Sequence, residues 1–306
     1  MIVSASCRTD IPAFYSEWLF ERLRAGFCLV RNPYSGKPYR VDLRPSQVDG
    51  FVFWTRNFGP VLLRLDELRS FARPFVVQYT VTGYPRQIEA AVIEPLRAIG
   101  QIGELAERVH PSCAVWRYDP ILFTTLTPAE YHLENFRDLS RRLKGSTNEV
   151  VVSFAQMYSK TRRNLDAAAA RNHFEWSDPA VETKIELLGQ LARFAREAGM
   201  QLTICTQPEL VREGAPGCQE TPGCQETIDA RCVDARRLEQ IGGFRIAAPA
   251  RGTRPGCACH ASRDIGDYDT CPHGCVYCYA VRHRRIALNN YKRHDAAGES
   301  LLPVID

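Results

Sequence analysis

Three cysteines close to the end of the chain have a spacing that could hold a metal cluster. Cys271, Cys275 and Cys278 follow the pattern Cys-x3-Cys-x2-Cys, and the aromatic residue Tyr277 directly precedes the last of them. Three thiolates at this spacing can bind three irons of a four-iron, four-sulfur cluster. The fourth iron then has no protein ligand and is open to a small molecule. The motif therefore predicts chemistry at an open iron.

Zinc is the main alternative for this motif. His273 lies between the first two cysteines and could complete a tetrahedral site of three cysteines and one histidine. Zinc sites more often use pairs of Cys-x2-Cys, a pattern that residues 271–278 do not have. The spacing favours an iron–sulfur cluster, and both metals remain open from the sequence.

A second group of cysteines could form another metal centre. Cys205 ends an expected strand, Cys232 closes an expected insertion, and Cys257 and Cys259 lie shortly before the three-cysteine motif. Four thiolates suit a second iron–sulfur cluster or a closed zinc site. Buried or incidental thiols explain the same residues equally well.

Five other cysteines are poorer candidates for metal ligands. Cys218 and Cys224 belong to a tandem repeat of the hexapeptide PGCQET. A loop that tolerates an added hexapeptide is expected to be exposed and free of tight geometric control. Cys7, Cys28 and Cys113 are expected to pack in the core or to have no role.

The composition is that of a globular protein of a reducing compartment. With 306 residues, of which 45% are hydrophobic, the chain can bury a large core, and we expect one domain. The start carries no signal-peptide pattern, and no apolar run approaches the roughly 20 residues of a membrane span. We therefore expect a cytoplasmic protein that does not enter a membrane. In that compartment twelve cysteines are better explained as metal ligands than as disulfides.

Short apolar runs alternate with helical patterns along the chain, as in a β/α fold with a parallel sheet. The expected strands are 2–6, 51–54, 75–80, 114–118, 150–154, 202–205 and 244–248. The expected helices are 15–25, 60–71, 87–99, 129–143, 162–170 and 178–198. No glycine-rich phosphate motif follows the first strand, so we expect a full or partial TIM-like (β/α) barrel rather than a doubly wound sheet.

The expected barrel spans residues 1–250, with an insertion loop at 206–240. Residues 251–306 form a cysteine-rich, cluster-binding segment and a C-terminal helix, packed on the same barrel. Basic residues at 282–285 and 292–294 could touch nucleic acid, but a solvated helix face explains them better. The net charge of +4 and the pI near 8.4 neither require nor exclude such a partner.

Polar residues follow the expected strands, where a barrel places its active site. Capping and turn formation explain any one of them, but as a set they are candidates to hold a cofactor and a substrate. These candidates are Thr9, Asp10, Thr55, Arg56, Arg117 and Asp119. Asp264, just before the three-cysteine motif, could orient a ligand or belong to a turn with Gly266 at positive φ.

The motif Cys271-x3-Cys275-Val276-Tyr277-Cys278 resembles the cluster-binding motif of radical S-adenosylmethionine (SAM) enzymes. The resemblance implies a [4Fe–4S] cluster on the three cysteines, SAM on its open iron, and adenine contacts from the backbone near Tyr277. It also implies cleavage of SAM to methionine and a 5′-deoxyadenosyl radical, which removes a hydrogen atom from an unknown substrate. A reducing partner such as flavodoxin or ferredoxin would supply the electron.

Radical SAM enzymes normally place this motif after the first strand, whereas here it lies near the end of the chain. A circular permutation would reconcile the two, with 244–248 as the displaced strand, because a cycle of β/α units has no privileged starting point. The polar strand ends loosely resemble the spore photoproduct lyase-like branch. If this is correct, residues 271–278 should face Thr9, Asp10 and Arg56 across one cavity.

Nearly the whole chain also resembles an uncharacterised bacterial family of domains of unknown function. The shared segments are SxRTDIPxFY, FWTRN, TxTGYPR, WRYDPI and a terminal DIGxYDxCPxGCxYCYA. This resemblance supplies no substrate. The alternative to a radical enzyme is an iron–sulfur or zinc-binding protein without radical chemistry, which would bind nucleic acid or another protein.

Overall fold

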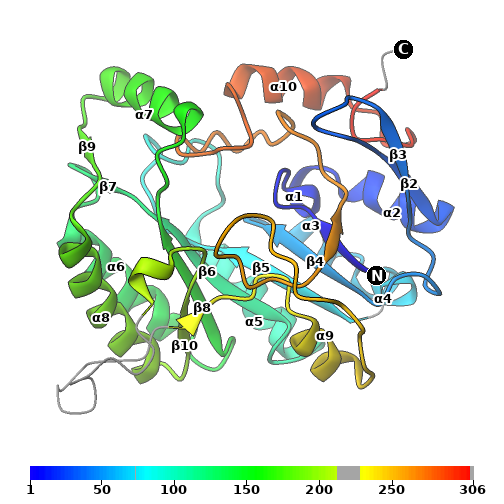
Figure 1. The fold of residues 1–306 in the computed structure, drawn as a ribbon, viewed down its shortest axis with the longest axis horizontal. Helices are drawn as coiled ribbons and strands as arrows, with labels where there is room; N and C mark the ends of the chain where they lie inside the picture. Colours follow the sequence, from blue (N-terminus) through cyan, green and yellow to red (C-terminus); the bar gives the residue numbers. More distant parts are fainter. Residues whose placement is uncertain (73, 212–227, 304–306) are drawn as a thin grey trace.

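A computed structural model describes residues 1–72, 74–211 and 228–303 (Figure 1). At its centre is a parallel sheet of eight strands in the order β11-β10-β8-β6-β5-β4-β1-β12. The strands are β1 (Ile2–Ala5), β4 (Gly50–Thr55), β5 (Phe75–Thr80), β6 (Ala114–Ile121), β8 (Glu149–Phe154), β10 (Gln201–Ile204), β11 (Ile228–Asp229) and β12 (Ser262–Asp264). Most are runs of Val, Ile and Phe buried on both faces, as parallel strands require.

The strand order runs in one direction from β1 to β11, and each strand pairs with its predecessor in the sheet. The exception is β12, which comes last in the chain but pairs with the other side of β1. Because right-handed crossovers in one direction put all helices on one face, this order is typical of barrels and partial barrels. Among the described residues the two edge strands, β11 and β12, do not pair with each other.

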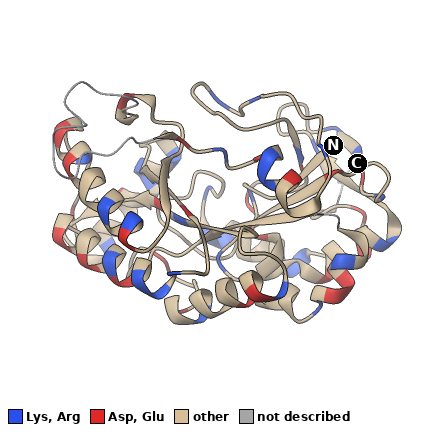
Figure 2. Ribbon diagram, turned by 90° about the horizontal axis from the view of Figure 1, so that it is seen from below, with Lys and Arg blue, Asp and Glu red and all other residues tan. Residues whose placement is uncertain are grey.

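Most helices cover one face of the sheet, here called the outer face, and Figure 2 shows several of them gathered along that side. Side chains such as Phe53, Val77 and Trp116 point to this face and pack against helix residues such as Leu105 and Leu191. The helices are α1 (Ile11–Phe14), α2 (Ser16–Ala25), α3 (Gly59–Leu62), α4 (Leu65–Phe71), α5 (Pro95–Arg108), α6 (Ala129–Arg142), α7 (Ser159–Asn172), α8 (Val181–Glu197), α9 (Ala235–Gly242) and α10 (Arg284–Arg293). The larger apolar core therefore lies between the outer face of the sheet and these helices.

The opposite, inner face carries a second apolar cluster. Alternate strand residues, among them Val52, Val76 and Val115, pack there against α9 and against the segment 244–259. Residues of β1, β4 and β5 thus alternate between the two cores along each strand, because successive side chains point to opposite faces. The cysteine-rich part of the chain covers the inner face of the sheet.

Two predictions about individual elements were wrong. Residues 244–248 do not form a strand: Phe244, Ile246 and Ala248 bury their side chains in the inner cluster without joining a ladder. The predicted helix at 87–99 begins only at Pro95, since residues 88–91 form backbone contacts with the cysteine loop. The strand that precedes the cysteine motif and pairs with β1 is β12, whose sequence Ser-Arg-Asp carries no apolar signal.

Smaller elements complete the fold. The hairpin of β2 (Phe27–Arg31) and β3 (Pro38–Asp42) and the pair β7 (Phe123–Thr124) and β9 (Trp176–Ser177) are antiparallel. Within 206–240, the described part holds a short 3-10 turn, β11 and most of α9, while Cys218 and Cys224 lie outside the described residues. None of the described helices combines the length and apolarity needed to cross a membrane.

Candidate functional site

The three-cysteine motif lies in the loop that follows β12, at the carboxyl edge of the sheet. Asp264 ends β12 beside Ser4 of β1, so the loop starts directly next to the first strand of the chain. The loop folds back on itself where Asp269 N donates to Ala280 O at 3.0 Å, and Arg282 N and Nε donate to the Asp269 carboxylate at 2.6 and 2.7 Å. A parallel edge strand therefore places the cysteines where active sites of such sheets lie.

The three thiols are free and half-buried. Burial raises the pKa of each; the pKa of Cys275 rises to about 12, although the nearby Arg56 guanidinium acts in the opposite direction. The thiols also act on one another electrostatically: Cys271 is affected by Cys275 and Cys278. Thiolates that act on one another in this way repel, and a bound cation would relieve that repulsion.

The loop is fixed against the segment between β5 and α5. Val276 N donates to Ile88 O at 3.0 Å, and Ala91 N donates to His273 O at 2.9 Å. Between these two bonds, Glu89 and Cys275 form an isolated antiparallel bridge. The backbone that carries the cysteines is thus held as an added strand-like layer over residues 88–91.

Asp10 is the central anchor of the loop. Its carboxylate caps α1 through Ala13 N at 3.1 Å and accepts from Thr55 Oγ1 at 2.6 Å and Arg56 N at 2.8 Å. The same carboxylate lies 2.7 Å from His273 Nε2. One buried side chain therefore joins the ends of β1 and β4 to the cysteine loop.

His273 is occupied by protein partners on both ring nitrogens. Nε2 bonds to Asp10, and Nδ1 lies 3.2 Å from Ala91 O. The ring is 3% exposed and packs edge-on against Phe14, with 4.6 Å between centroids. A histidine held in this way has no nitrogen left for a metal, which argues against a zinc site of three cysteines and His273.

A buried ion pair supports the aromatic residue of the motif. Arg56 Nη1 lies 2.9 Å from Glu89 Oε1, and the Tyr277 hydroxyl bonds to both Arg56 and Glu89. Thr82 Oγ1 donates to the same carboxylate oxygen at 2.6 Å. Since a buried charge must be paired, these side chains form one unit that fixes Tyr277 next to the cysteines.

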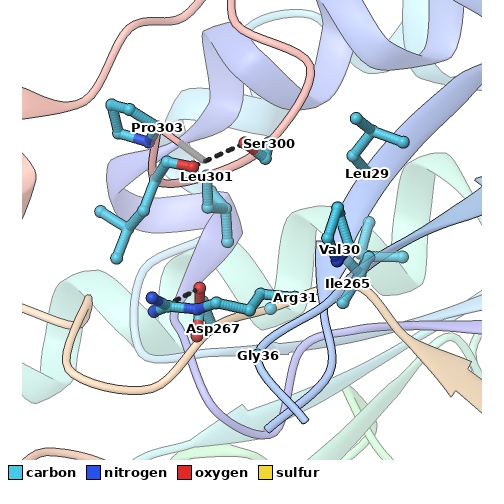
Figure 3. A pocket seen from close by; sticks show the side chains of 12 residues that line it. Leu29, Val30, Arg31, Gly36, Ile265, Asp267, Ser300, Leu301 and Pro303 are labelled. Atoms are coloured by element: carbon cyan, nitrogen blue, oxygen red, sulfur yellow. Dashed lines mark hydrogen bonds and ion pairs between the residues drawn. The ribbon is translucent and has the colours of Figure 1, made fainter. Parts of the chain in front are cut away.

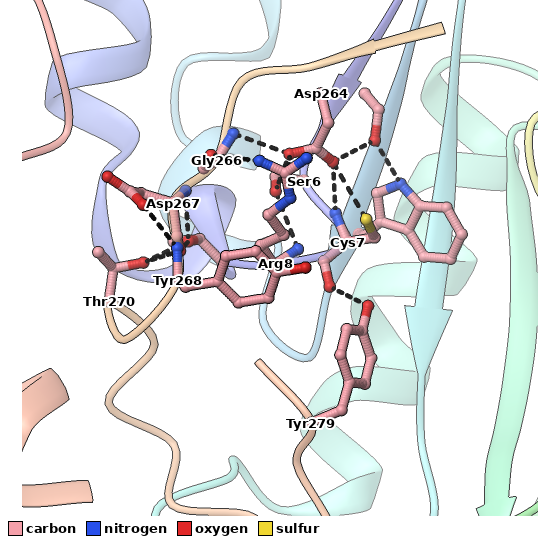
Figure 4. A network of polar contacts seen from close by, with 12 residues as sticks. Ser6, Cys7, Arg8, Asp264, Gly266, Asp267, Tyr268, Thr270 and Tyr279 are labelled. Carbon is pink, nitrogen blue, oxygen red and sulfur yellow. Dashed lines mark hydrogen bonds and ion pairs between the residues drawn. The ribbon is translucent and has the colours of Figure 1, made fainter. Parts of the chain in front are cut away.

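Asp264 binds protein groups at the end of β1, as Figure 4 shows. It accepts from Ser4 Oγ at 2.9 Å, Ser6 Oγ at 2.7 Å and Cys7 N at 3.0 Å. Gly266 does not have positive φ; it is required because a Cβ there would lie 2.0 Å from Ser6 Oγ. The alternative of a turn with Gly266 at positive φ is therefore wrong, and Asp264 joins β12 to β1 through its hydrogen bonds.

Thr9 also belongs to the loop contacts. Its Oγ1 donates to Asp267 O at 2.7 Å and bonds to Thr270. The structure thus brings Thr9, Asp10, Thr55, Arg56 and Tyr277 together around the cysteine loop. They meet through direct hydrogen bonds that brace the loop, rather than across an open cavity.

Arg117 and Asp119 lie apart from this group, on the inner face. Arg117 Nε donates to Asp119 Oδ2 at 3.1 Å, and its Nη1 donates to Gln78 Oε1 at 3.2 Å and to Cys232 Sγ at 2.9 Å. The pair therefore belongs to the neighbourhood of the second cysteine group. Cys28 and Cys113 are buried in the outer core, as expected.

Two residues of the site were missed by the sequence analysis. Glu89 does not directly follow a strand and lies in a stretch predicted as helix, and His273 was considered only as a zinc ligand. In the part of the chain that the structure describes, no three or more His, Cys, Asp or Glu side chains are already gathered tightly enough around one point to hold a single metal ion.

A pocket of about 170 Å³ lies behind the loop (Figure 3). Its walls come from the β2–β3 hairpin, residues 265–267 and residues 300–303. Arg31 and Asp267 form an ion pair of 3.0 Å in it. No cysteine lines it, so this pocket adjoins the back of the loop and does not contain the thiols.

Fold and site together define a parallel α/β protein with a three-thiol loop at the end of an edge strand. The family model described as "Domain of unknown function (DUF1848)" matches residues 2–280, and the chain belongs to that family. No curated protein matches the chain.

Among solved structures, the chain is similar to a crystal structure of D-hydantoinase, with 10% identity and a TM-score of 0.31, covering 67% of this chain and 40% of that one. It is also similar to D-hydantoinase from a Bacillus sp. AR9, with 13% identity, a TM-score of 0.29, and 57% and 36% coverage. The chain thus spans less than half the length of either enzyme. Likeness at this level carries no argument about function.

Proposed function

We propose that the protein is a radical SAM enzyme built on a circularly permuted, partial (β/α) barrel. Cys271, Cys275 and Cys278 would hold a [4Fe–4S] cluster whose fourth iron binds SAM. The observation that carries the proposal is the position of the thiols: they follow an edge strand that pairs with β1, at the carboxyl edge of the sheet. When bound, such a cluster supplies the electron that cleaves SAM to methionine and a 5′-deoxyadenosyl radical.

The donor set fits a cluster with one open iron. Three thiols lie in one loop, and because burial raises the pKa of each, a metal that binds there would displace their protons. The nearest histidine is taken by Asp10 and Ala91, so it offers no fourth ligand. Three protein ligands and an unliganded iron are what binding of a small chelating molecule requires.

The strand order supports the permutation. Starting at β12 and continuing with β1, β4, β5, β6, β8, β10 and β11, the sheet reads as one unbroken progression. In that reading the cysteine loop follows the first strand of the barrel. A permutation that places the chain ends between β12 and β1 changes the order of the elements in the sequence, but it leaves their neighbours in space unchanged.

The residues around the loop would position it. Asp10 holds the loop through His273, and Glu89 and Arg56 hold Tyr277. The polar side-chain atoms of Thr9, Asp10 and Thr55 already form hydrogen bonds within the protein. We therefore infer that these residues orient the loop instead of binding SAM directly. SAM and substrate would then lie between the loop and the ends of β5, β6 and β8. On that side of the loop, Thr161 Oγ1 of α7 donates to Tyr277 O at 3.4 Å.

Anaerobic reconstitution tests the proposal. With iron and sulfide, then dithionite and SAM, the full chain should release 5′-deoxyadenosine. Cys275→Ala should abolish the release, whereas Cys28→Ala, a buried thiol of the outer core, should retain it. Failure of a fully loaded wild-type cluster to cleave SAM would overturn the radical mechanism and leave an iron–sulfur binding or electron-transfer protein.

A further inference from the structure

Four cysteines from three separate stretches of the chain lie together at the inner face of the sheet. Cys205 follows β10, Cys232 follows β11, and Cys257 and Cys259 precede β12. The Sγ atoms of Cys205 and Cys232 are 3.7 Å apart, and thiol contacts link Cys232 to Cys259 and Cys259 to Cys257. All four are free, so no disulfide explains why they converge.

We propose that these four cysteines bind one zinc ion in a closed tetrahedral site, separate from the three-cysteine loop. Zn–S bonds of about 2.3 Å at tetrahedral angles place sulfurs about 3.8 Å apart, close to the separation of Cys205 and Cys232. In a four-iron cluster each thiolate binds a different iron, so its sulfurs lie farther apart. The separation of this pair therefore favours one ion over a second cluster.

Hydrogen-bond donors already point at three of the sulfurs. Arg117 Nη1 lies 2.9 Å from Cys232 Sγ, and Val233 N lies 3.3 Å from Cys259 Sγ. Arg254 Nη2 reaches Cys205 Sγ at 3.7 Å. Four thiolates around Zn²⁺ leave two negative charges, which N–H donors and guanidinium groups offset.

Buried Arg117 gives this arrangement its strongest support. Arg117 is 4% exposed, and a buried guanidinium requires negatively charged partners. Asp119 supplies one of them, and the remaining Nη1 points to Cys232 and Gln78. A metal-bound thiolate at Cys232 would complete the pairing, whereas a neutral thiol would leave the cation less compensated.

The site would close the inner core. Residues 244–259 cover the sheet without forming a strand, and Cys257 and Cys259 pack in the same cluster as Leu238 and Ile246. The thiol contacts run in one row from Cys205 to Cys257, so binding requires the two end thiols to turn towards the middle pair. The ion would then tie β10 and β11 to the covering segment, a structural role.

Metal analysis of the full chain, purified without iron reconstitution, tests this site. We expect about one zinc per chain in the wild type and in Cys275→Ala. Zinc should fall at least about tenfold in Cys232→Ser and Cys259→Ser, while Cys113→Ser, a buried thiol of the outer core, keeps it. Retention of zinc in both Cys232→Ser and Cys259→Ser would overturn the proposal. Loss of iron and sulfide, in place of zinc, from these two variants would overturn it as well. So would a Cys205–Cys232 disulfide in metal-free wild type.

Cobalt substitution keeps the test decisive if the serine variants do not fold. Wild type and Cys275→Ala, stripped of metal and given Co²⁺ alone, should both develop the visible absorption of a tetrahedral thiolate site. Absence of that absorption in Cys275→Ala would contradict the assignment. The result is independent of SAM cleavage, because Cys275→Ala removes the radical site and leaves the four-cysteine site intact.

Discussion

The two cysteine groups of this protein differ in how the chain brings them together. The three-cysteine loop takes its thiols from residues 271–278, and its anchors are polar groups at the ends of β1 and β4. The four-cysteine group takes its thiols from three distant stretches and packs them in an apolar core. Under our proposals, the local three-cysteine loop leaves one iron open for chemistry, whereas the distributed four-cysteine group holds the fold together.

This contrast predicts the largest effect on stability at the four-cysteine group. With free zinc held constant and no iron cluster present, Cys232→Ser should lower the free energy of unfolding by about 4 kcal/mol, because Arg117 loses a buried partner and the ion loses a ligand. Cys278→Ser should cost about 1 kcal/mol under the same conditions. Urea unfolding measures both, and equal losses would erase the distinction between the two groups.

Asp10→Ala should have the next largest effect, a loss of about 3 kcal/mol. The substitution leaves Thr55, Arg56 N and His273 without their shared acceptor in a buried place. Asp49→Ala removes an exposed carboxylate paired with the N-terminus at 2.6 Å and should cost less than about 1 kcal/mol. If the two variants unfold alike in urea, Asp10 is not the anchor described above.

Glu89→Gln should destabilise the protein by about 2 kcal/mol, since it leaves the buried Arg56 guanidinium without its counter-charge. The matched change Glu94→Gln removes an exposed partner of Arg86 and should lie within about 0.5 kcal/mol of wild type. Thermal unfolding of the two variants side by side provides the measurement. A wild-type stability in Glu89→Gln would mean that the ion pair does not hold the loop.

The smallest expected effects come from two tyrosines in the loop. Tyr277→Phe removes a half-buried hydroxyl that bonds to Arg56 and Glu89 and should cost about 1.5 kcal/mol. Tyr279 is 43% exposed and its hydroxyl donates to Cys7 O at 2.8 Å, so Tyr279→Phe should cost about 0.5 kcal/mol. Reversal of this order in urea unfolding would show that the bonds to Arg56 and Glu89 do not hold Tyr277 in place.

The sequence predicted the central strands because short apolar runs that alternate with helical patterns are typical of buried parallel strands. It missed β12, whose polar residues are held in the sheet by pairing with β1 and by the bonds of Asp264. It also placed a strand at 244–248, where apolar side chains fill the inner core without a ladder. Apolar content reports burial, and only tertiary pairing decides which buried segment is a strand.

The candidate site could be predicted in part for a similar reason. Asp10 and Arg56 follow strands, and a polar residue at that position can be recognised from the sequence alone. Glu89 gives no such signal, because its partner Arg56 lies in another strand-end loop and its neighbour Cys275 lies far along the chain. The partnership of His273 with Asp10 likewise depends on the closeness of β12 and β1, which spacing within the motif cannot reveal.

Electron paramagnetic resonance of the reduced, reconstituted protein tests the central claim most directly. We predict the signal of a reduced four-iron cluster that changes when SAM is added, in the wild type and in Cys232→Ser if it folds, and that is lost in Cys275→Ala. A cluster signal that SAM leaves unchanged, or the absence of any cluster from reconstituted wild type, would contradict the assignment of Cys271, Cys275 and Cys278 to a SAM-binding cluster.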